Sequence, residues 1–551
     1  MENLQWRALA ALVISLLILL SWNFFTGAPA PKKAPPPPQA QELAQNSTPN
    51  AVEQPATTVA PRASALPAPA HPARDIVVTT DLYRAVFTEQ GARLKSFQLF
   101  KFRETVDKNS PPKELVRTTN PADLPLGVAL LKQNLDTSQA VFTASTQQLD
   151  LRGQGAKSGD VSFELTTPQG VQLIKRFDFQ RDLYRINTAV ALRNLGGQPI
   201  EAEPSMSLIN TPFSTDTSHY KQTAVLVGDE IETTATSKLT EPKLVRGDVR
   251  WAAYDQPFFM SALAPAPEKK TVSGETVNVS ISSSGDVVRE SLISPPRQLL
   301  PNQELVYNYA IYYGPKEMNV LKAQGLGLEK IIEYGWFDVI GKPLLVVLNF
   351  IDQFTHNYGV AVILLTVLIK VLFWPLSHKS YRSMKEMQRL QPKMAKLREK
   401  HKGDTQKLNE EVLNLYRTYK VNPMGGCLPM LAQVPVFFAL YRVLQYSIEL
   451  RHAPFIGWIN DLSAPDRLNI GIAIPYLGGL PVLTILMGVS MWMQQKMTPV
   501  SGDPSQAKMM QVLPLVFTFM FLYFPSGLVL YWLVNNVLSI GQQYYINHRM
   551  A

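Results

Sequence analysis

The order of hydrophobic and polar positions divides this chain into two halves of different kinds. Between about residues 75 and 327, apolar residues alternate with polar ones in short runs. After about residue 327 they form long apolar stretches. A period of two predicts half-buried strands, whereas continuous apolar stretches of about 18 residues predict membrane-spanning helices. We therefore expect an all-β domain followed by a polytopic helical membrane domain.

The alternating pattern extends over residues 75–320. In the run 171–179, Val171, Leu173, Phe177 and Phe179 alternate with polar residues, and the runs 184–192 and 305–313 repeat the period. Turn signals separate such runs, which is typical of a β-sandwich. The only cysteine, Cys427, lies outside this region, so we expect the domain to be stable without disulfides.

The chain begins with an apolar run, residues 8–25, behind Arg7. It is either a signal peptide or a retained anchor, and Pro31 at the first position after a cleavage-like Ala-Pro-Ala favours an anchor over residues 1–27. Residues 28–72 hold twelve Pro and twelve Ala with few residues that could form a core. Residues 28–74 are therefore predicted to be an extended tether.

The apolar stretches predict six spans. A shorter stretch, 343–354, is too short to cross a membrane, and 328–337 is amphipathic and aromatic, so residues 321–358 are expected to form an interfacial helix and connector. A Pro-Ser-Gly sequence at 525–527 breaks the last apolar run into a hairpin. The expected spans are 8–25, 359–374, 427–446, 474–493, 509–524 and 527–547.

The segment 376–424 carries twelve Lys or Arg against five acidic residues. The positive-inside rule makes this segment cytoplasmic, which places both termini inside and the β-domain outside, in the periplasm of a bacterial inner membrane. Apolar residues at helical spacing on each side of the turn 401–404 predict a helical hairpin, with Met384, Met387 and Met394 on one stripe. These methionines either pack the two arms together or capture apolar clients, and the sequence leaves both possibilities open.

A cation lies inside the second span. A charged lysine at mid-membrane raises the free energy of insertion. Either snorkelling of Lys370 to the headgroups or a functional site would explain its presence. The other core spans also carry polar residues toward the cytoplasmic side, which favours a wet cavity open to the cytoplasm, although interhelical hydrogen bonding is the alternative. The polar residues of this gradient are Thr366, Gln433, Gln494, Gln495, Gln511, Asn535, Asn536, Ser539, Gln542 and Gln543.

Motifs for bond chemistry are missing from the sequence. It has no Gly-rich Walker loop, His-Glu-x-x-His or Cys-x-x-Cys, and its seven histidines are scattered, so we expect no enzyme, metal or cofactor. A secondary transporter is a rival interpretation, but the chain has no evident inverted repeats. A sensor with a periplasmic binding domain is another, but the cytoplasmic parts are small for an output module.

Four motifs of the membrane half are distinctive: Trp374-Pro-Leu376, Leu390-Gln-Pro-Lys393, Asn422-Pro-Met-Gly-Gly-Cys-Leu-Pro429 and Phe524-Pro-Ser-Gly-Leu-Val-Leu-Tyr531. They resemble the motifs of the YidC-type membrane protein insertases, relatives of the mitochondrial and chloroplast insertases. The resemblance covers the whole chain and implies a periplasmic β-supersandwich and a core of five spans, residues 359–551. It also implies a hydrophilic inner-leaflet groove with one cation, usually Arg, for which this chain has Lys370.

The resemblance further implies a mechanism and partners. Newly made membrane proteins would enter the groove from the cytoplasm and leave sideways along an apolar slide, alone or with the Sec translocon. Ribosomes and anionic lipids are expected partners, without nucleic-acid specificity. The slide would consist of Phe437, Met487, Met520, Tyr523, Tyr531 and Trp532.

Overall fold

The computed structural model describes residues 71–549 except 215–219, 266–275, 402, 420, 422–427, 473, 476 and 498–503. The predicted anchor and most of the tether lie outside this range. The described chain separates into two compact units. The first holds residues up to 101, 113–256 and 260–314, and the second holds 102–112, 257–259 and 315–551.

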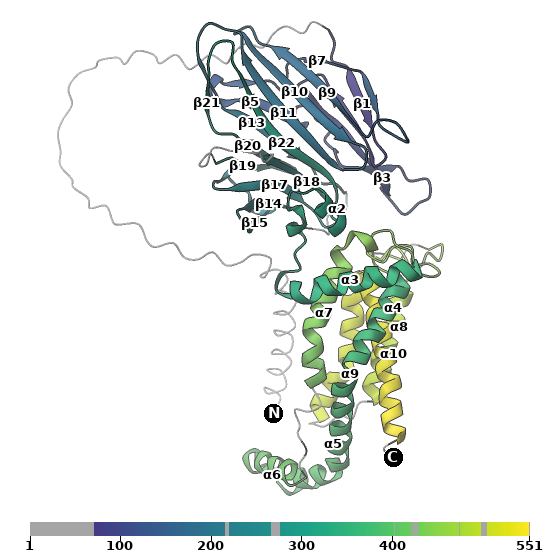
Figure 1. Ribbon diagram of the computed structural model, residues 1–551. Coiled ribbons are helices and arrows are strands. Elements are labelled where there is room, and N and C mark those ends of the chain that lie inside the picture. The colour runs from purple at the N-terminus through teal and green to yellow at the C-terminus, as the bar shows by residue number, and fades with distance from the viewer. Residues whose placement is uncertain are drawn as a thin grey trace, which may run out of the picture. The chain divides into compact units, whose positions relative to one another are not determined.

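The first unit is built from mainly antiparallel sheets (Figure 1), and its strands are those that the two-residue period predicts. One pair, Asp75–Thr79 with Gln148–Asp150, is parallel. Within the described residues its largest sheet has nine strands, in the order β15-β14-β17-β18-β22-β11-β10-β9-β7. In chain order these are β7 (Thr143–Ala144), β9 (Ser158–Thr166), β10 (Val171–Gln180), β11 (Arg185–Asn194), β14 (Gln222–Val227), β15 (Glu230–Ala235), β17 (Val249–Asp255), β18 (Phe259–Pro265) and β22 (Glu304–Pro315).

Three smaller sheets complete this unit. The six-stranded sheet comprises β5 (Gly127–Leu130), β6 (Leu135–Asp136), β13 (Pro204–Asn210), β16 (Lys243–Val245), β19 (Asn278–Ser284) and β20 (Val287–Ile293). The five-stranded sheet comprises β1 (Asp75–Thr79), β2 (Tyr83–Thr88), β3 (Arg93–Arg103), β4 (Pro112–Glu114) and β8 (Gln148–Asp150). The strands β12 (Ile200–Ala202) and β21 (Arg297–Leu299) form a pair.

The alternating residues lie where their period predicts. Phe177 and Phe179 of β10, Ile186 and Val190 of β11, and Ile311 of β22 are fully buried. Strands β10, β11 and β22 are neighbours in register, with Phe177 opposite Thr188 and Thr188 opposite Tyr309. Because alternate side chains point to one face of a sheet, these residues make one continuous apolar surface.

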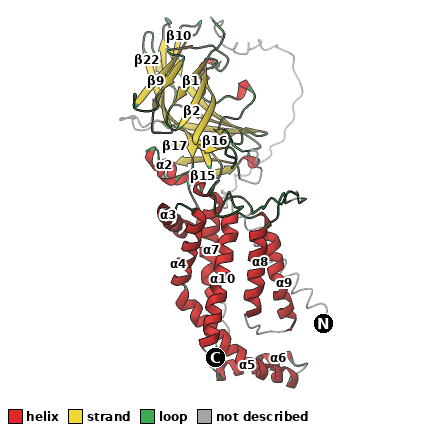
Figure 2. Ribbon diagram, turned by 90° about the vertical axis from the view of Figure 1, so that its right-hand side faces the viewer, coloured by secondary structure: helices red, strands yellow, loops and turns green. Residues whose placement is uncertain are grey.

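The second unit is helical. Its helices are α2 (Met318–Ala323), α3 (Asp338–Thr355), α4 (Tyr358–Leu372), α5 (Trp374–Lys400), α6 (Thr405–Thr418), α7 (Leu428–Tyr446), α8 (Val482–Met497), α9 (Pro504–Met520) and α10 (Ser526–Arg549). Helices α4, α7, α8 and α10 run alongside one another, and α3 crosses their end where α4 begins (Figures 1 and 2). Buried apolar residues from α3, α4, α7, α8 and α10 share one core cluster.

The lengths of the helices bear on the predicted spans. Among the described residues, no single helix is both long and apolar enough to cross a membrane, and α4 with α5 meets that criterion only as a pair bent by 63°. The bend falls where Pro375 opens α5. The break predicted at 525–527 is present, because α9 and a short 3₁₀ turn, Phe521–Tyr523, precede the start of α10 at Ser526.

Two boundaries differ from the sequence-based expectation. The amphipathic helix is α3, and the stretch 328–337 forms 3₁₀ turns with Leu328, Ile331 and Tyr334 buried, because Gly335 at φ 64° interrupts the chain. On α3 and just before it, apolar side chains such as Trp336, Val339 and Phe354 are exposed. The expected span from 474 begins only at Val482, because Gly478 at φ 74° and Pro481 precede the helix.

Candidate functional site

Lys370 lies near the end of α4, about 18 Å along the helix from its first residue. Its side chain is only 9% exposed, and its Nζ donates a hydrogen bond to Ser539 Oγ of α10 at 2.7 Å. The Ser539 hydroxyl in turn donates a hydrogen bond to the carbonyl oxygen of Asn535, one turn earlier, also at 2.7 Å. Within the described residues, no carboxylate forms an ion pair with Lys370. A lysine ammonium has three N–H donors, so two remain available.

The polar residues predicted to line a cavity meet on α4, α7, α8 and α10. Gln433 of α7 donates from Nε2 to Asn535 Oδ1 at 3.0 Å and lies 3.4 Å from the Tyr531 hydroxyl. Asn536 Nδ2 donates to Ser490 Oγ of α8 at 2.9 Å. These bonds join side chains separated by 46 to 102 positions in the chain, so the network is a product of helix packing.

The remaining polar residues differ in how many of their hydrogen-bonding groups are paired. Thr366 donates from its hydroxyl to the carbonyl of Val362 in its own helix at 2.6 Å. Gln543 donates to the Met497 carbonyl at 2.6 Å, while its amide oxygen has no partner among the described residues. Gln542 is 3% exposed, and neither its amide oxygen nor its nitrogen has a hydrogen-bond partner among the described residues. Buried amides without partners are uncommon in packed cores, so interhelical hydrogen bonding alone does not explain Lys370 and Gln542.

The structure buries two of the predicted slide residues in the helical core, packs three against the same core and leaves one exposed. Phe437 and Trp532 contact each other edge to face, with ring centroids 4.8 Å apart. Met487 and Tyr531 are buried in the helical core, and Met520 packs against it. Tyr523 is 59% exposed, and Gln511 at the predicted groove mouth is also exposed.

Several contributors were missed from the sequence. Phe517 and Phe521 stack around Trp532 at 6.3 and 5.3 Å, and their spacing of four residues was the available signal. Ser490 gave no signal, because a single serine in an apolar helix usually bonds its own backbone. It does so here as well, to the carbonyl of Met487 at 2.6 Å.

The hairpin of α5 and α6 buries two of the three methionines predicted on its stripe. Met387 and Leu390 of α5 form a small cluster with Val421, against which Leu415 and Tyr416 of the second arm pack. Met394 is also buried, and its sulfur accepts from the Tyr416 hydroxyl at 3.4 Å. Met384 is half-buried. This placement favours packing of the arms over capture of clients by Met387 and Met394.

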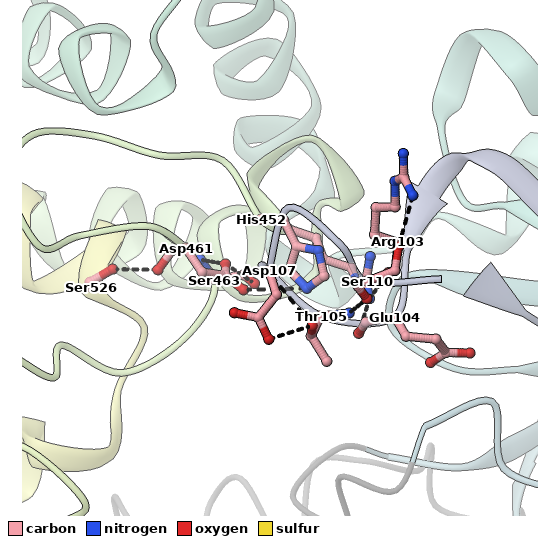
Figure 3. A network of polar contacts seen from close by, with 10 residues as sticks. Arg103, Glu104, Thr105, Asp107, Ser110, His452, Asp461, Ser463 and Ser526 are labelled. Atoms are coloured by element: carbon pink, nitrogen blue, oxygen red, sulfur yellow. Dashed lines mark hydrogen bonds and ion pairs between the residues drawn. The ribbon is translucent and has the colours of Figure 1, made fainter. Parts of the chain in front are cut away.

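A loop after α7 closes the end of the bundle away from Lys370. Asp466 is 2% exposed and accepts bonds from the backbone N–H groups of Leu483 and Thr484, at 2.5 and 3.2 Å, and from Trp458 Nε1 at 2.6 Å. The carboxylate thereby caps the start of α8. The first turn of α10 is held in a similar way, since Ser526 Oγ donates to the Asp461 carbonyl at 2.9 Å (Figure 3).

A turn formed by residues 103–110 belongs to the same network of loops. Thr105 N donates to Ser110 Oγ, and Arg103 donates to the Ser110 carbonyl, both at 2.8 Å (Figure 3). Arg451 donates to the carbonyl oxygens of Arg103 and Glu104, at 2.8 and 3.2 Å. The sequence gave no signal for these loop contacts.

Comparisons with known proteins cover both units. The family model described as 60Kd inner membrane protein matches residues 350–551, and the model described as YidC periplasmic domain matches residues 75–347. The curated "Membrane protein insertase YidC" of Syntrophobacter fumaroxidans is 42% identical over 555 residues, which are 99% of this chain and 100% of that protein. The protein of the same name from Syntrophus aciditrophicus is 42% identical over 564 residues, covering 98% of this chain and 99% of its own length.

Solved structures give weaker matches. The crystal structure of an active YidC insertase with its first transmembrane domain resolved matches with a TM-score of 0.37 and 19% identity, covering 86% of this chain and 92% of that chain. A galactose mutarotase related enzyme from Lactobacillus acidophilus matches with a TM-score of 0.30 and 10% identity, covering 44% of this chain and 97% of that chain.

Proposed function

This chain belongs to the YidC family of membrane protein insertases, and from that premise we propose that the polar network around Lys370 receives the acidic tails of client proteins. The protein is a membrane protein insertase, and its substrates are newly made membrane proteins. The observation that carries the proposal is a buried cation with a single hydrogen-bond partner, Ser539, and no carboxylate partner in the described chain.

A lone buried cation is a poor structural element and a suitable receptor. An uncompensated charge in a low-dielectric interior costs several kcal/mol, so retaining Lys370 for packing would be unfavourable. The two available N–H donors are the groups with which a carboxylate would pair. Two unit charges 10 Å apart attract by roughly 1.7 kcal/mol at an effective dielectric constant near 20, which is more than tenfold in a rate.

The path of insertion follows from the polarity of the helices. A hydrated notch on the cytoplasmic side shortens the apolar distance that a polar tail must cross. The aromatic group of Phe437, Phe517 and Trp532 would offer an apolar route for the client's helix. The membrane potential then favours outward movement of acidic residues by about 2.3 kcal/mol per charge per 100 mV.

The proposal includes a topology. The chain would cross the inner membrane six times, with both termini in the cytoplasm and residues 75–320 in the periplasm. Helix α3 would lie in the interface with its exposed apolar side chains, among them Val346 and Phe350, in the acyl region. Transfer would proceed without covalent chemistry, metal or cofactor, alone or with the Sec translocon, with ribosomes and anionic lipids as further partners.

Substitution of Lys370 tests the receptor role. We expect Lys370→Arg to be tolerated, Lys370→Ala to slow insertion of an acidic-tailed client about tenfold, and Lys370→Glu to slow it further through like-charge repulsion. The measurement is insertion by the purified protein in liposomes, with two clients that differ only in the charge of the translocated tail. A lysine that merely snorkels would be replaceable by Ala without a client-dependent defect. Equal effects on neutral and acidic tails would therefore exclude electrostatic attraction.

A further inference from the structure

A groove separates the two arms of the cytoplasmic hairpin, α5 and α6. Its volume is about 360 Å³, which lies at the small end of the range of ligand pockets. Both arms contribute to its walls. The lining residues are Lys393, Lys396, Leu397 and Lys400 of α5, and Glu411, Asn414, Leu415 and Thr418 of α6.

The lysines make one wall of the groove positive. Lys393, Lys396 and Lys400 are spaced by three and four residues, which places them along one face of α5. Lys393 contacts the hydroxyl of Tyr419 and lies 4.1 Å from that ring's centroid, so it braces the second arm. Lys396 and Lys400 are exposed, and no ion pair is recorded for either among the described residues.

Packing between the two arms forms the groove in the absence of a ligand. The buried cluster around Met387 and Leu390 holds the arms together, and the Tyr416 hydroxyl donates to the Met394 sulfur at 3.4 Å. Leu397 and Leu415 are half-buried and form an apolar floor. Since both arms are already packed, a ligand would not have to order them.

We propose that this groove binds a short acidic peptide segment that also carries an apolar side chain, and that the segment belongs to a client before its insertion. Carboxylates of the segment would pair with Lys396 and Lys400, and the apolar side chain would lie on Leu397 and Leu415. The identification of the segment as a client rests on the proposed function. The groove is a separate site from Lys370 and would act earlier, as a place of first binding.

The walls favour a peptide over a phosphate-bearing partner. Asn414 and Thr418 on α6 offer donors and acceptors that a peptide backbone can use. Glu411 adds a negative charge to the same wall, which repels dense phosphates more than it repels a segment with one or two carboxylates. The apolar floor has no counterpart in a lipid headgroup.

The first test removes the two exposed lysines. The full protein, in discs of zwitterionic lipid, is titrated with a fluorescent peptide containing two Glu and one Leu, and with the same peptide containing Gln for Glu. We expect Lys396→Gln with Lys400→Gln to weaken binding of the acidic peptide about five- to thirtyfold and to leave the Gln peptide unchanged. The matched control is Arg398→Gln with Arg417→Gln, which removes two charges from the same arms outside the groove and should change binding by less than about twofold. An equal loss in both double variants would overturn the proposal, because only net charge would then matter.

A second variant is expected to gain affinity, so that misfolding cannot imitate the result. Glu411→Gln removes the repelling carboxylate and should tighten binding of the acidic peptide about two- to fivefold. Unchanged or weaker binding contradicts the proposal. So does a result in which the lysine variant binds the peptide normally but loses affinity for vesicles containing anionic lipid, because the groove would then be a headgroup site. The outcome for Lys370→Ala is independent of all these results.

Discussion

Two buried lysines show how the surroundings of a single residue decide its role. Lys175 in β10 donates to three carbonyl oxygens, those of Gly91, Ala92 and Leu126, at 3.0, 2.7 and 2.6 Å. Burial and the nearby Arg93 hold the pKa of Lys175 well below its usual range, but every donor of its protonated form has an acceptor. Within the described part of the chain Lys370 has one acceptor, Ser539. Lys175 is therefore a structural residue, whereas in the proposed function two donors of Lys370 are left for a client carboxylate.

Glu449 provides a pH-dependent prediction at the residue scale. It follows α7, and Asn349 donates to its carboxylate at 3.5 Å. Burial, with a smaller contribution from the charge of Glu317, raises the pKa of Glu449 from 4.5 to about 7. The folded protein therefore holds this proton up to about pH 7, whereas the unfolded chain releases it near pH 4.5. Stability should fall as the pH rises through this window and should not change further above it.

Glu449→Gln should remove that dependence, since its amide does not titrate. The measurement is the melting temperature of the detergent-solubilised protein at pH 5 and pH 8. We expect the difference between the two pH values to be larger for the wild type than for the variant. An identical difference in both proteins would show that Glu449 does not titrate in this window.

At the scale of elements, hydrogen bonds from one loop hold the starts of two helices. The apolar runs predicted the helices, but α8 begins eight residues later than its run, after Gly478 and Pro481. Asp466 then accepts hydrogen bonds from the first turn of α8. The start of α10 likewise depends on carbonyls of the same loop, with Ser526 and Gly527 N–H donating to Ala464 and Leu462 at 2.8 and 2.9 Å. One loop therefore fixes the starts of two helices.

Asp466→Ala should destabilise the helical unit. It would leave the N–H groups of Leu483 and Thr484 and the indole of Trp458 without their acceptor, at a loss of about 2–4 kcal/mol. Chemical denaturation in detergent, followed by tryptophan fluorescence, measures this loss. The control is Glu386→Gln, which removes an exposed pair with Arg382 on α5 and should change stability by less than about 0.5 kcal/mol. Similar losses in both variants would contradict a capping role for Asp466.

At the scale of the whole molecule, the proposed site and the β-domain belong to different units. Lys370, Ser539 and the groove of the hairpin all lie within residues 315–551. The first unit has its own buried core, including Phe177 and Trp251. Units with separate cores can generally fold separately.

Deletion of most of residues 75–314 tests this separation. We expect the remaining protein to insert clients within about twofold of the full-length rate, because the site stays intact. Insertion in liposomes at equal protein level is the measurement. Lys370→Ala in the shortened chain is the control, because it shows how much of the insertion rate depends on the proposed site. The shortened chain also lacks the partners of Arg451, so its folding in the membrane has to be verified separately. A folded but inactive shortened chain would refute the expectation.

The pattern along the chain was sufficient for the class of most elements, and the 3₁₀ turns of residues 328–337 are an exception. Strands such as β10 and helices such as α7 follow from periods and run lengths, because these depend on neighbours along the backbone. The family was predicted from motifs. A functional site at Lys370 was predicted because a charge inside an apolar run raises the free energy of membrane insertion. Which side chains meet was decided by packing: Ser539 as the partner of Lys370, Asp466 as the cap of α8, and the burial of Met387 and Met394 between the arms. A hydrogen bond between residues 169 positions apart depends on the crossing of two helices. Crossings arise from side-chain volumes across the whole bundle, which no local pattern contains.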